Sequence, residues 1–402
     1  MTEVLIVVVQ ALLLLVVANR YVGKLFLWAF RSREENRPAD DFEPTVTVVI
    51  PLYNEGDSIR RTIRSVVGQD YPAHKLNVVV VDDCSTDGSY LHACREAQGN
   101  PRVRILRNSQ NMGKRRSINR AVRMTDSEII VSVDSDVIVK SNAIGLLIRE
   151  FNTPDMAAVG GRVDIENKHE SWLTRMQAIK YFYSYYFTKG LEPAFKSVMC
   201  LSGCLTAYRR SVLLELEPIL EQRAMLGVPI KYGEDRFLTR QIIKAGYKTT
   251  MNLNAVCKTK AVDTVEGYFA QQLRWRRSNI VDYIGGLIHV WRQHPAISIH
   301  FFASCAFLLV YPSVIAHSLL TGWFWELMLA HLGFTSVLAA VYAVMGRHQE
   351  TEEKVAPFNI LFLGMITPIT YCVLVPLAAC TLDSGCWETR GHEDVPEPAL
   401  GP

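Results

Sequence analysis

Two common nucleotide-binding loops are missing from this chain of 402 residues. It has no G-x-x-x-x-G-K-S/T loop, which argues against a P-loop nucleotidase. It has no G-x-G-x-x-G after its first predicted strand, which argues against a dinucleotide enzyme. A block of lysine and arginine is also missing and the net charge is only +3, so we expect no nucleic-acid partner.

Paired cysteines are missing too. The nine cysteines form no C-x-x-C pair and show no zinc-finger spacing. Their odd number and scattered placement fit a reducing compartment in which thiols serve as small apolar side chains. We therefore assign the cysteines no catalytic role.

Long apolar runs, in contrast, are plentiful at both ends of the chain. A bilayer needs about 20 apolar residues per helix. Because Glu3 precedes the first run and the cationic residues follow it, we predict an uncleaved anchor with its C-terminal side in the cytoplasm; a cleaved signal peptide is the alternative. The runs are Val4–Phe30, with a short polar interruption, Ser298–Leu320, Trp323–Met345 and Pro357–Ala379.

The last apolar run differs from the others because Gly364, Pro368 and Pro376 interrupt it. Proline inside a helix kinks or breaks it. Arg347 and Lys354 precede this run and place its start in the cytoplasm. We predict an interfacial or re-entrant segment, which keeps the C-terminal tail in the cytoplasm, and a membrane span is the alternative.

The middle of the chain has the pattern of a soluble α/β domain. Short β-branched runs alternate with amphipathic helical segments, which predicts a doubly wound sheet. The predicted strands are Thr45–Ile50, Leu76–Val81, Val103–Leu106 and Glu128–Val133, and the predicted helices are Ser58–Gln69, Arg115–Met124 and Phe237–Ala245.

Three polar clusters follow predicted strands of this sheet. They are Tyr53-Asn54-Glu55, Asp82-Asp83 and Asp134-Ser135-Asp136. Ligands of such sheets lie at the carboxyl ends of the strands, so these clusters should meet. Asp134 and Asp136 can share a hard divalent cation that also binds a diphosphate, although a solvated turn is the alternative. Asp83 can accept hydrogen bonds from a base or ribose, and it can also cap the turn that follows.

Three later segments carry polar side chains suited to sugar transfer. Gly113-Lys114-Arg115 opens a helix and suits a diphosphate, or is a solvated basic turn. Asp235, in Gly233-Glu234-Asp235-Arg236, falls in the first turn of a helix. It is a candidate general base, or an anion stabilised by the helix dipole. Trp275, beside Gln271 and Arg274, offers a platform for a sugar ring, or an anchor at a membrane interface.

Together these motifs resemble the membrane-integrated, processive family-2 glycosyltransferases, and most closely the hyaluronan synthase and nodulation protein C (chitooligosaccharide synthase) group. The resemblance extends from about Val4 to Arg390. The motifs that carry it, in order, are Asp82-Asp83, Gly113-Lys114-Arg115, Asp134-Ser135-Asp136, Ser202-Gly203-Cys204 through Tyr208-Arg209, Gly233-Glu234-Asp235-Arg236, Gln271-x-x-Arg274-Trp275 and Trp387-Glu388-Thr389-Arg390.

The resemblance implies a role for each matching residue. Asp235 is the catalytic base, and Asp134 and Asp136 hold Mg²⁺ or Mn²⁺. The implied nucleotide-sugar contacts are Tyr53, Glu55, Asp83, Lys114, Arg115, Asp134, Arg274 and the gating residues Trp387, Thr389 and Arg390. The implied acceptor contacts are Ser202, Gly203, Cys204, Tyr208, Gln271 and Trp275.

The resemblance also implies an architecture and a location. The fold would be a GT-A-type nucleotide-sugar-binding α/β domain with α-helical transmembrane and interfacial segments, in a multi-pass protein of the cell (plasma or inner) membrane. The expected regions are an anchor and linker (1–41), a cytoplasmic catalytic domain (42–262), interfacial amphipathic helices (263–297), two transmembrane helices (298–346), and an interfacial or re-entrant segment with a gating tail (347–402).

The implied reaction is inverting transfer from a UDP-sugar to a growing oligosaccharide or polysaccharide, processive and coupled to translocation. The expected donor is UDP-GlcNAc, alone or alternating with UDP-glucuronate. The alternative is a β-glucan or a glucose–glucuronate capsule polysaccharide synthase. Since one N-terminal apolar run replaces the family's usual two, a homo-oligomer would complete the channel.

Two other classes fit less well. A transporter of polymer or lipid would not need three acidic clusters at strand ends. A membrane-tethered nucleotidyltransferase would lack the sugar platform and would release diphosphate instead of UDP.

Overall fold

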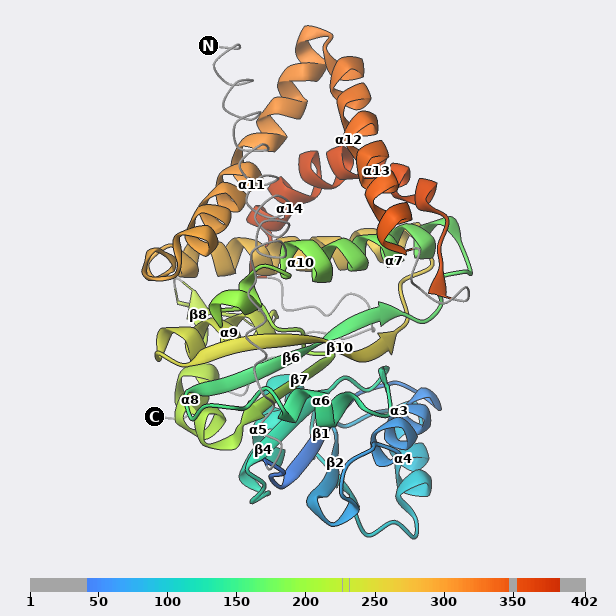
Figure 1. Ribbon diagram of the computed structural model, residues 1–402, viewed down its shortest axis with the longest axis vertical. Helices are drawn as coiled ribbons and strands as arrows, with labels where there is room; N and C mark the ends of the chain where they lie inside the picture. The colour runs from blue at the N-terminus through green and yellow to red at the C-terminus, as the bar shows by residue number, and fades with distance from the viewer. Residues whose placement is uncertain (1–41, 226, 231, 347–352, 384–402) are drawn as a thin grey trace.

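The computed structural model describes residues 42–225, 227–230, 232–346 and 353–383. The predicted N-terminal anchor (1–41) and the predicted gating residues Trp387, Thr389 and Arg390 therefore lie outside the described residues. The remainder forms an α/β domain, a layer of two long helices above it, and apolar helices beyond that layer (Figure 1).

An eight-stranded sheet forms the centre of the α/β domain, in the order β3-β2-β1-β4-β7-β6-β10-β5. Strands β3, β2, β1 and β4 are parallel, whereas β7 runs antiparallel between β4 and β6. The strands are β1 (Val46–Leu52), β2 (Leu76–Asp82), β3 (Val103–Arg107), β4 (Ile129–Val133), β5 (Ile138–Val139), β6 (Met156–Ile165), β7 (Leu205–Arg209) and β10 (Lys248–Thr259), and β8 (Ala224–Met225) pairs with β9 (Val228–Pro229) apart from them.

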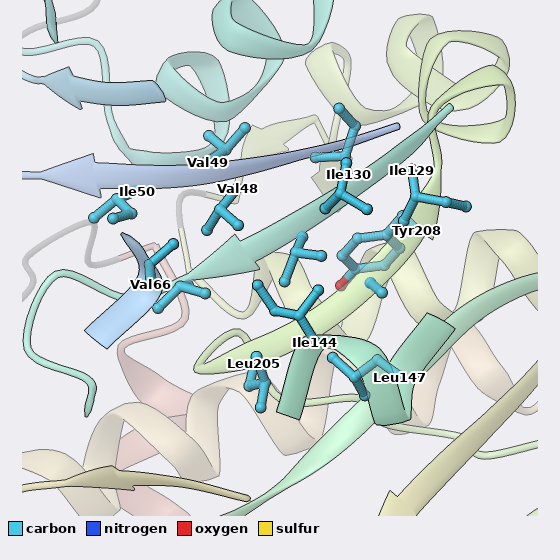
Figure 2. Close-up of a cluster of buried hydrophobic side chains, with 14 of the residues drawn as sticks. Val48, Val49, Ile50, Val66, Ile129, Ile130, Ile144, Leu147, Leu205 and Tyr208 are labelled. Carbon is cyan, nitrogen blue, oxygen red and sulfur yellow. The ribbon is translucent and has the colours of Figure 1, made fainter. Parts of the chain in front are cut away.

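The central strands are buried along their whole length. Every residue of β1 and β4 is buried, as expected for parallel strands covered on both faces. Figure 2 shows side chains of β1 and β4 packed with those of α6 and β7 in one hydrophobic core. The helices of the domain are α3 (Ser58–Val67), α4 (Ser89–Ala97), α5 (Lys114–Arg123), α6 (Ala143–Ile148), α8 (Arg210–Glu221) and α9 (Glu234–Lys244).

The predicted strands and helices of this domain are all present, with ends shifted by a few residues. The largest change is at α9, which begins at Glu234 rather than at Phe237. Strand β1 continues past Ile50 to Leu52, although Pro51 has no N–H to donate. The proline is tolerated because the pairing of β1 with β4 ends at Val49, so no hydrogen bond to β4 is lost.

The strand order fixes where a ligand can bind. The chain leaves β1 toward β2 on one side, and β4 lies on the other side, so the connections diverge between β1 and β4. Such a switch point opens a crevice at the carboxyl ends of the strands. Glu55 follows β1 and Asp134 follows β4, which places both beside this crevice.

Two helices, α7 (Trp172–Tyr183) and α10 (Val265–Gly286), form the layer above the sheet (Figure 1). The side chain of Gln177 on α7 donates a 2.7 Å hydrogen bond to the carbonyl of Val262, just before α10. A π-helical turn, Ser184–Thr188, extends α7. This layer separates the sheet from the apolar helices.

The described residues contain three helical segments long and apolar enough to cross a membrane. Helices α11 (Pro295–Thr321) and α12 (Phe324–Met345) form a hairpin that rises from the layer (Figure 1). The third segment, Pro357–Cys380, consists of a 3₁₀ turn (Pro357–Ile360), α13 (Leu361–Cys372) and α14 (Leu374–Cys380), with a break at Val373.

Both ends of the third segment return to the same layer. Its 3₁₀ turn packs on α7 and α12, and α14 packs on α10. The break at Val373 lets the chain reverse between these contacts. This course is compatible with the re-entrant segment predicted from the prolines, which stays a prediction.

Candidate active site

The loop after β4 is held in place by its middle residue. The hydroxyl of Ser135 donates a 3.2 Å hydrogen bond to Glu55, and its carbonyl accepts a 2.8 Å bond from Thr62 on α3. Asp134 and Asp136 on either side of it both line a cavity between the sheet and the α7–α10 layer. The spacing of the two acids therefore brings both carboxylates to one wall.

Lys114, the first residue of α5, links two acidic segments. Its Nζ lies 2.5 Å from an oxygen of Asp134 and 3.3 Å from an oxygen of Glu234. Burial alone would lower the pKa of this lysine, but attraction to Asp134, Glu234 and Asp235 outweighs burial and raises its pKa. Lys114 is therefore a fixed cation at the centre of the site.

Gly203 is the close neighbour that makes this contact possible. A Cβ atom at Gly203 would lie 2.8 Å from Nζ of Lys114 and 3.8 Å from the carboxylate oxygens of Asp134. A larger residue would thus push the lysine away from its partner.

Asp235 lies in the first turn of α9, as predicted. Gly233 precedes the helix with φ of +66°, and a Cβ atom there would lie 2.1 Å from the hydroxyl of Ser278 on α10. One oxygen of Asp235 accepts a bond from the N–H of Arg236 at 2.8 Å, and the other accepts from Gly203 at 3.4 Å. These contacts aim the carboxylate into the cavity, which it lines.

The cavity has a volume of about 490 Å³ and brings together ten of the residues predicted from the sequence. They come from α5, the loops after β4 and before β7, the start of α9, and α10. The ten are Lys114, Asp134, Asp136, Ser202, Gly203, Cys204, Asp235, Gln271, Arg274 and Trp275.

Sequence reasoning missed the wall formed by α7 and the turn after it. Lys180, Tyr181, Tyr185 and Lys189 line the cavity there. The rings of Tyr181 and Trp275 lie 6.5 Å apart. Helix α7 carries two cations, Arg175 and Lys180, and its sequence does not show which of them faces the cavity.

The predicted nucleotide end of the site lies beside the cavity. Asp83 accepts bonds from the side chain of Asn108 and from the N–H groups of Met112 and Gly113, all at 2.7–2.8 Å. Asp83 thus orders the turn that leads to Lys114. The turn directly after Asp83, which the sequence offered it as a cap, is instead capped by Asp82, whose carboxylate accepts from the N–H of Ser85 at 3.4 Å. Contact with a base or ribose stays a prediction for Asp83, and nucleotide contact stays one for Tyr53 and Glu55.

Two predicted residues line a neighbouring cavity instead. Arg115 and Tyr208 lie in a smaller, mostly apolar cavity between α5, α8 and α9, which shares Lys114, Gly203 and Asp235 with the first. Tyr208 is only 4% exposed, and Figure 2 shows its ring beside Ile129 and Ile130 in the core. Its position under the site does not support the acceptor contact predicted for it.

Cys204 faces the acids across the cavity. Burial first, and then the nearby carboxylates of Asp134 and Asp136, raise the pKa of its thiol. The thiol therefore stays protonated at neutral pH and is a poor nucleophile. This agrees with the assignment of no catalytic role to the cysteines.

Asp134 and Asp136 fit a divalent cation only in part. In the described ranges no group of three or more histidine, cysteine, aspartate or glutamate side chains is arranged around a metal position. Two carboxylates on one wall suit a hard cation such as Mg²⁺ that takes its other ligands from substrate phosphate and water. The donor set therefore fits a metal that is shared with a diphosphate.

Comparisons with known proteins agree with this geometry. The family model described as "Glycosyltransferase like family 2" matches residues 44–278. An N-acetylglucosaminyltransferase of Rhizobium sp. (strain N33) is 30% identical over 367 residues, which are 90% of this chain and 80% of that protein. An N-acetylglucosaminyltransferase of Rhizobium meliloti (strain 1021) is 30% identical over 89% of this chain and 83% of its own.

A solved structure extends the likeness to the fold. The mannosyltransferase PcManGT from Pyrobaculum calidifontis, in complex with GDP-Man and Mn²⁺, matches with a TM-score of 0.60 and 19% identity. The match covers 96% of this chain and 99% of that chain. It confirms the predicted GT-A-like fold.

Proposed function

Because the chain belongs to the family-2 glycosyltransferases and is a glycosyltransferase, we propose that it transfers N-acetylglucosamine from UDP-GlcNAc, alone or alternating with glucuronate from UDP-glucuronate, to a growing saccharide. The names of the rhizobial relatives support the first donor. We further propose that the reaction is processive and coupled to translocation, with the catalytic domain in the cytoplasm.

One observation carries the proposal. A single cavity is lined by Asp134 and Asp136 at one wall, by Lys114 and Asp235, and by Trp275 on α10. The two aspartates with Lys114 suit a nucleotide diphosphate. The ring of Trp275 suits a saccharide. Since α10 lies directly under the apolar helices, the acceptor would be held beside the membrane.

The mechanism is a single displacement with inversion. Asp235 takes the proton from the acceptor hydroxyl, the new bond forms between that oxygen and the anomeric carbon, and the bond to the diphosphate breaks. Lys114 stabilises the negative charge that develops on the leaving UDP. A Mg²⁺ or Mn²⁺ ion held by Asp134 and Asp136 would supply further charge stabilisation to the diphosphate.

Ser202, Gly203 and Cys204 are our candidates for contact with the N-acetyl group. They form the loop before β7 and line the cavity beside Asp134. Gly203 lets this loop approach Lys114 closely, and Ser202 offers a hydroxyl donor.

The test is a product assay with purified protein in nanodiscs. UDP release and product mass would be measured with UDP-GlcNAc, UDP-glucuronate and UDP-glucose, singly and in pairs. We expect release from UDP-GlcNAc. Release from UDP-glucose alone would favour the glucan or glucose–glucuronate alternative and would overturn the assignment of the Ser202–Cys204 loop.

A second test concerns the membrane. A reporter fused after Pro402 should be cytoplasmic if the segment 357–380 is re-entrant. An extracytoplasmic reporter would mean that this segment spans the bilayer.

A further inference from the structure

Lys180 is a lysine in the wall of the cavity that none of the motifs includes. It projects from α7 toward α10, where its Nζ lies 2.9 Å from Oε1 of Gln272 and 3.4 Å from the hydroxyl of Tyr268. The same Nζ lies 5.3 Å from the centroid of the Trp275 ring. It therefore lies beside the platform assigned to the acceptor, with one of its three N–H groups left for the cavity.

The charge of Lys180 has no counter-charge in the described part of the chain. Its described polar partners are an amide and a phenol, and the charged group that acts on it is another cation, Arg276. Burial and then Arg276 lower the pKa of Lys180 to about 7. Lys114 in the same cavity has the opposite surroundings, with three carboxylates that raise its pKa.

An enclosed ammonium without an anion is costly, so an anion supplied by a bound molecule would be stabilising beside Lys180. The donor side of the cavity already has anions of its own, in Asp134, Asp136 and Asp235. Such an anion is therefore expected on the other side, from the molecule that lies against Trp275.

We propose that Lys180 binds a carboxylate of the acceptor saccharide, which makes the acceptor a uronic-acid-containing chain rather than a neutral one. This inference rests on the proposed function and selects among its acceptors. A sugar ring packed on Trp275 has its ring substituents within reach of an ammonium 5.3 Å from the indole centroid. The alternative oxyanion, a phosphate, is usually held by several donors or by arginine. Arg276 lies 3.8 Å over the ring of Tyr371 instead, and Arg274, which lines the cavity, is the arginine assigned to the nucleotide-sugar.

The experiment compares two acceptors that differ only in charge. One is an oligosaccharide of alternating glucuronate and N-acetylglucosamine, and the other is the same oligosaccharide with its carboxyl groups reduced to alcohols. Binding would be measured by calorimetry, and transfer from UDP-GlcNAc by UDP release, on the full chain in nanodiscs. The variants are Lys180→Met, Lys180→Arg and, as a control, Lys244→Met at the exposed end of α9.

We expect Lys180→Met to raise KM and Kd for the acidic acceptor about 10-fold or more, the usual scale of a charge-assisted hydrogen bond, with kcat little changed. Binding of the reduced acceptor should not change, and Lys180→Arg should retain tight binding. In the wild type, KM for the acidic acceptor should rise as the pH increases above about 7 and Lys180 loses its proton, whereas it should stay flat in Lys180→Arg.

Three results would overturn the proposal. The first is equal binding of both acceptors by the wild type. If UDP is still released in that case, the proposed transferase activity is unaffected and only the role of Lys180 is rejected. The second is an equal loss of both acceptors in Lys180→Met, which would mean a structural role. The third is a phosphorylated, carboxyl-free oligosaccharide that binds in a Lys180-dependent way more tightly than the acidic one.

Discussion

Asp235 is the residue on which the chemistry should depend most. Replacement by asparagine keeps the size and one of the two hydrogen bonds that Asp235 accepts from Gly203 and Arg236, but removes the base. We expect Asp235→Asn to reduce sugar transfer by at least ~10², with binding of the UDP-sugar nearly unchanged. Steady-state UDP release and calorimetric titration of the donor would measure the two effects.

The matched control is Asp263→Asn, at an exposed position before α10, which should be near wild type in both assays. Turnover of Asp235→Asn within a few-fold of wild type would remove Asp235 from the role of base.

Cys84 lies in the left-handed backbone region, with φ of +65°. A residue with a Cβ atom costs about 1–2 kcal/mol there, whereas glycine is free of this strain. Part of the gain is offset because glycine is more flexible in the unfolded chain. We expect Cys84→Gly to stabilise the protein by about 0.5 kcal/mol, seen as a higher thermal unfolding midpoint.

Cys84→Ala separates strain from the loss of the thiol. It keeps the Cβ atom, so its midpoint should not rise. A rise equal to that of Cys84→Gly would show that the thiol, and not the backbone, was unfavourable.

At the residue scale, the acids were predictable because they follow strands whose ends must meet. Lys180 and Tyr181 were not, because only packing of α7 against α10 brings them to the cavity. The resemblance places Tyr208 among the acceptor contacts, whereas the structure buries its side chain. Its strand pairs on both sides, with Ile130 and with Ala158, and the tyrosine points into the core.

At the scale of secondary-structure elements, Glu353 links the segment before α13 to the sheet through ion pairs. Glu353 forms ion pairs with Lys168, in the loop after β6, and with Lys258 on β10, the latter at 2.7 Å. Burial raises the pKa of Glu353, but the hydrogen bonds from the two lysines outweigh it and lower the pKa to about 2. We expect Glu353→Gln to destabilise the protein because it removes both ion pairs. The loss should be limited to about 1–2 kcal/mol, because the carboxylate is partly exposed and solvent screens the pairs.

The pH dependence of stability gives a sharper test of the ion pairs that Glu353 forms. Because the folded pKa lies below the unfolded value of about 4.3, the stabilisation is complete above that pH and is lost as the pH falls toward 2. The difference in unfolding midpoint between wild type and Glu353→Gln should therefore shrink across this range. Glu266→Gln, at an exposed position on α10, should show no such trend.

The elements of the α/β domain were predictable because their patterns are local. Continuous β-branched runs, such as that of β1, indicate buried parallel strands, and the spacing of Ile59 and Ile63 indicates the inner face of α3. The role of α7 was not predictable, because periodicity does not reveal that its π-helical end and α10 cover a cavity.

For the whole molecule, metal dependence follows from the shared donor set. Asp134 and Asp136 would supply two carboxylates, and the diphosphate and water would supply the remaining ligands of the cation. We expect excess chelator to reduce transfer by at least ~10² and Mg²⁺ or Mn²⁺ to restore it, measured as UDP release.

The unfolding midpoint should not change with chelation, because the described residues hold no cluster that would bind a structural metal. Full activity in excess chelator would leave Lys114 as the chief stabiliser of the leaving group.

The hairpin of α11 and α12 has one further consequence. At 1.5 Å per residue, helices of 27 and 22 residues reach about 40 and 33 Å, and the exposed Trp323 and Trp325 mark their far end. At the near end, Phe301 packs on Tyr283 of α10, and the hydroxyl of Tyr183 on α7 donates to the carbonyl of Leu338. In a membrane whose thickness differs from the length of the hairpin, tilting is one way to accommodate the mismatch, and such a tilt would act on the two helices that carry Lys180 and Trp275. On the proposed function, the acyl-chain length of the surrounding lipid would therefore influence how tightly the acceptor is held.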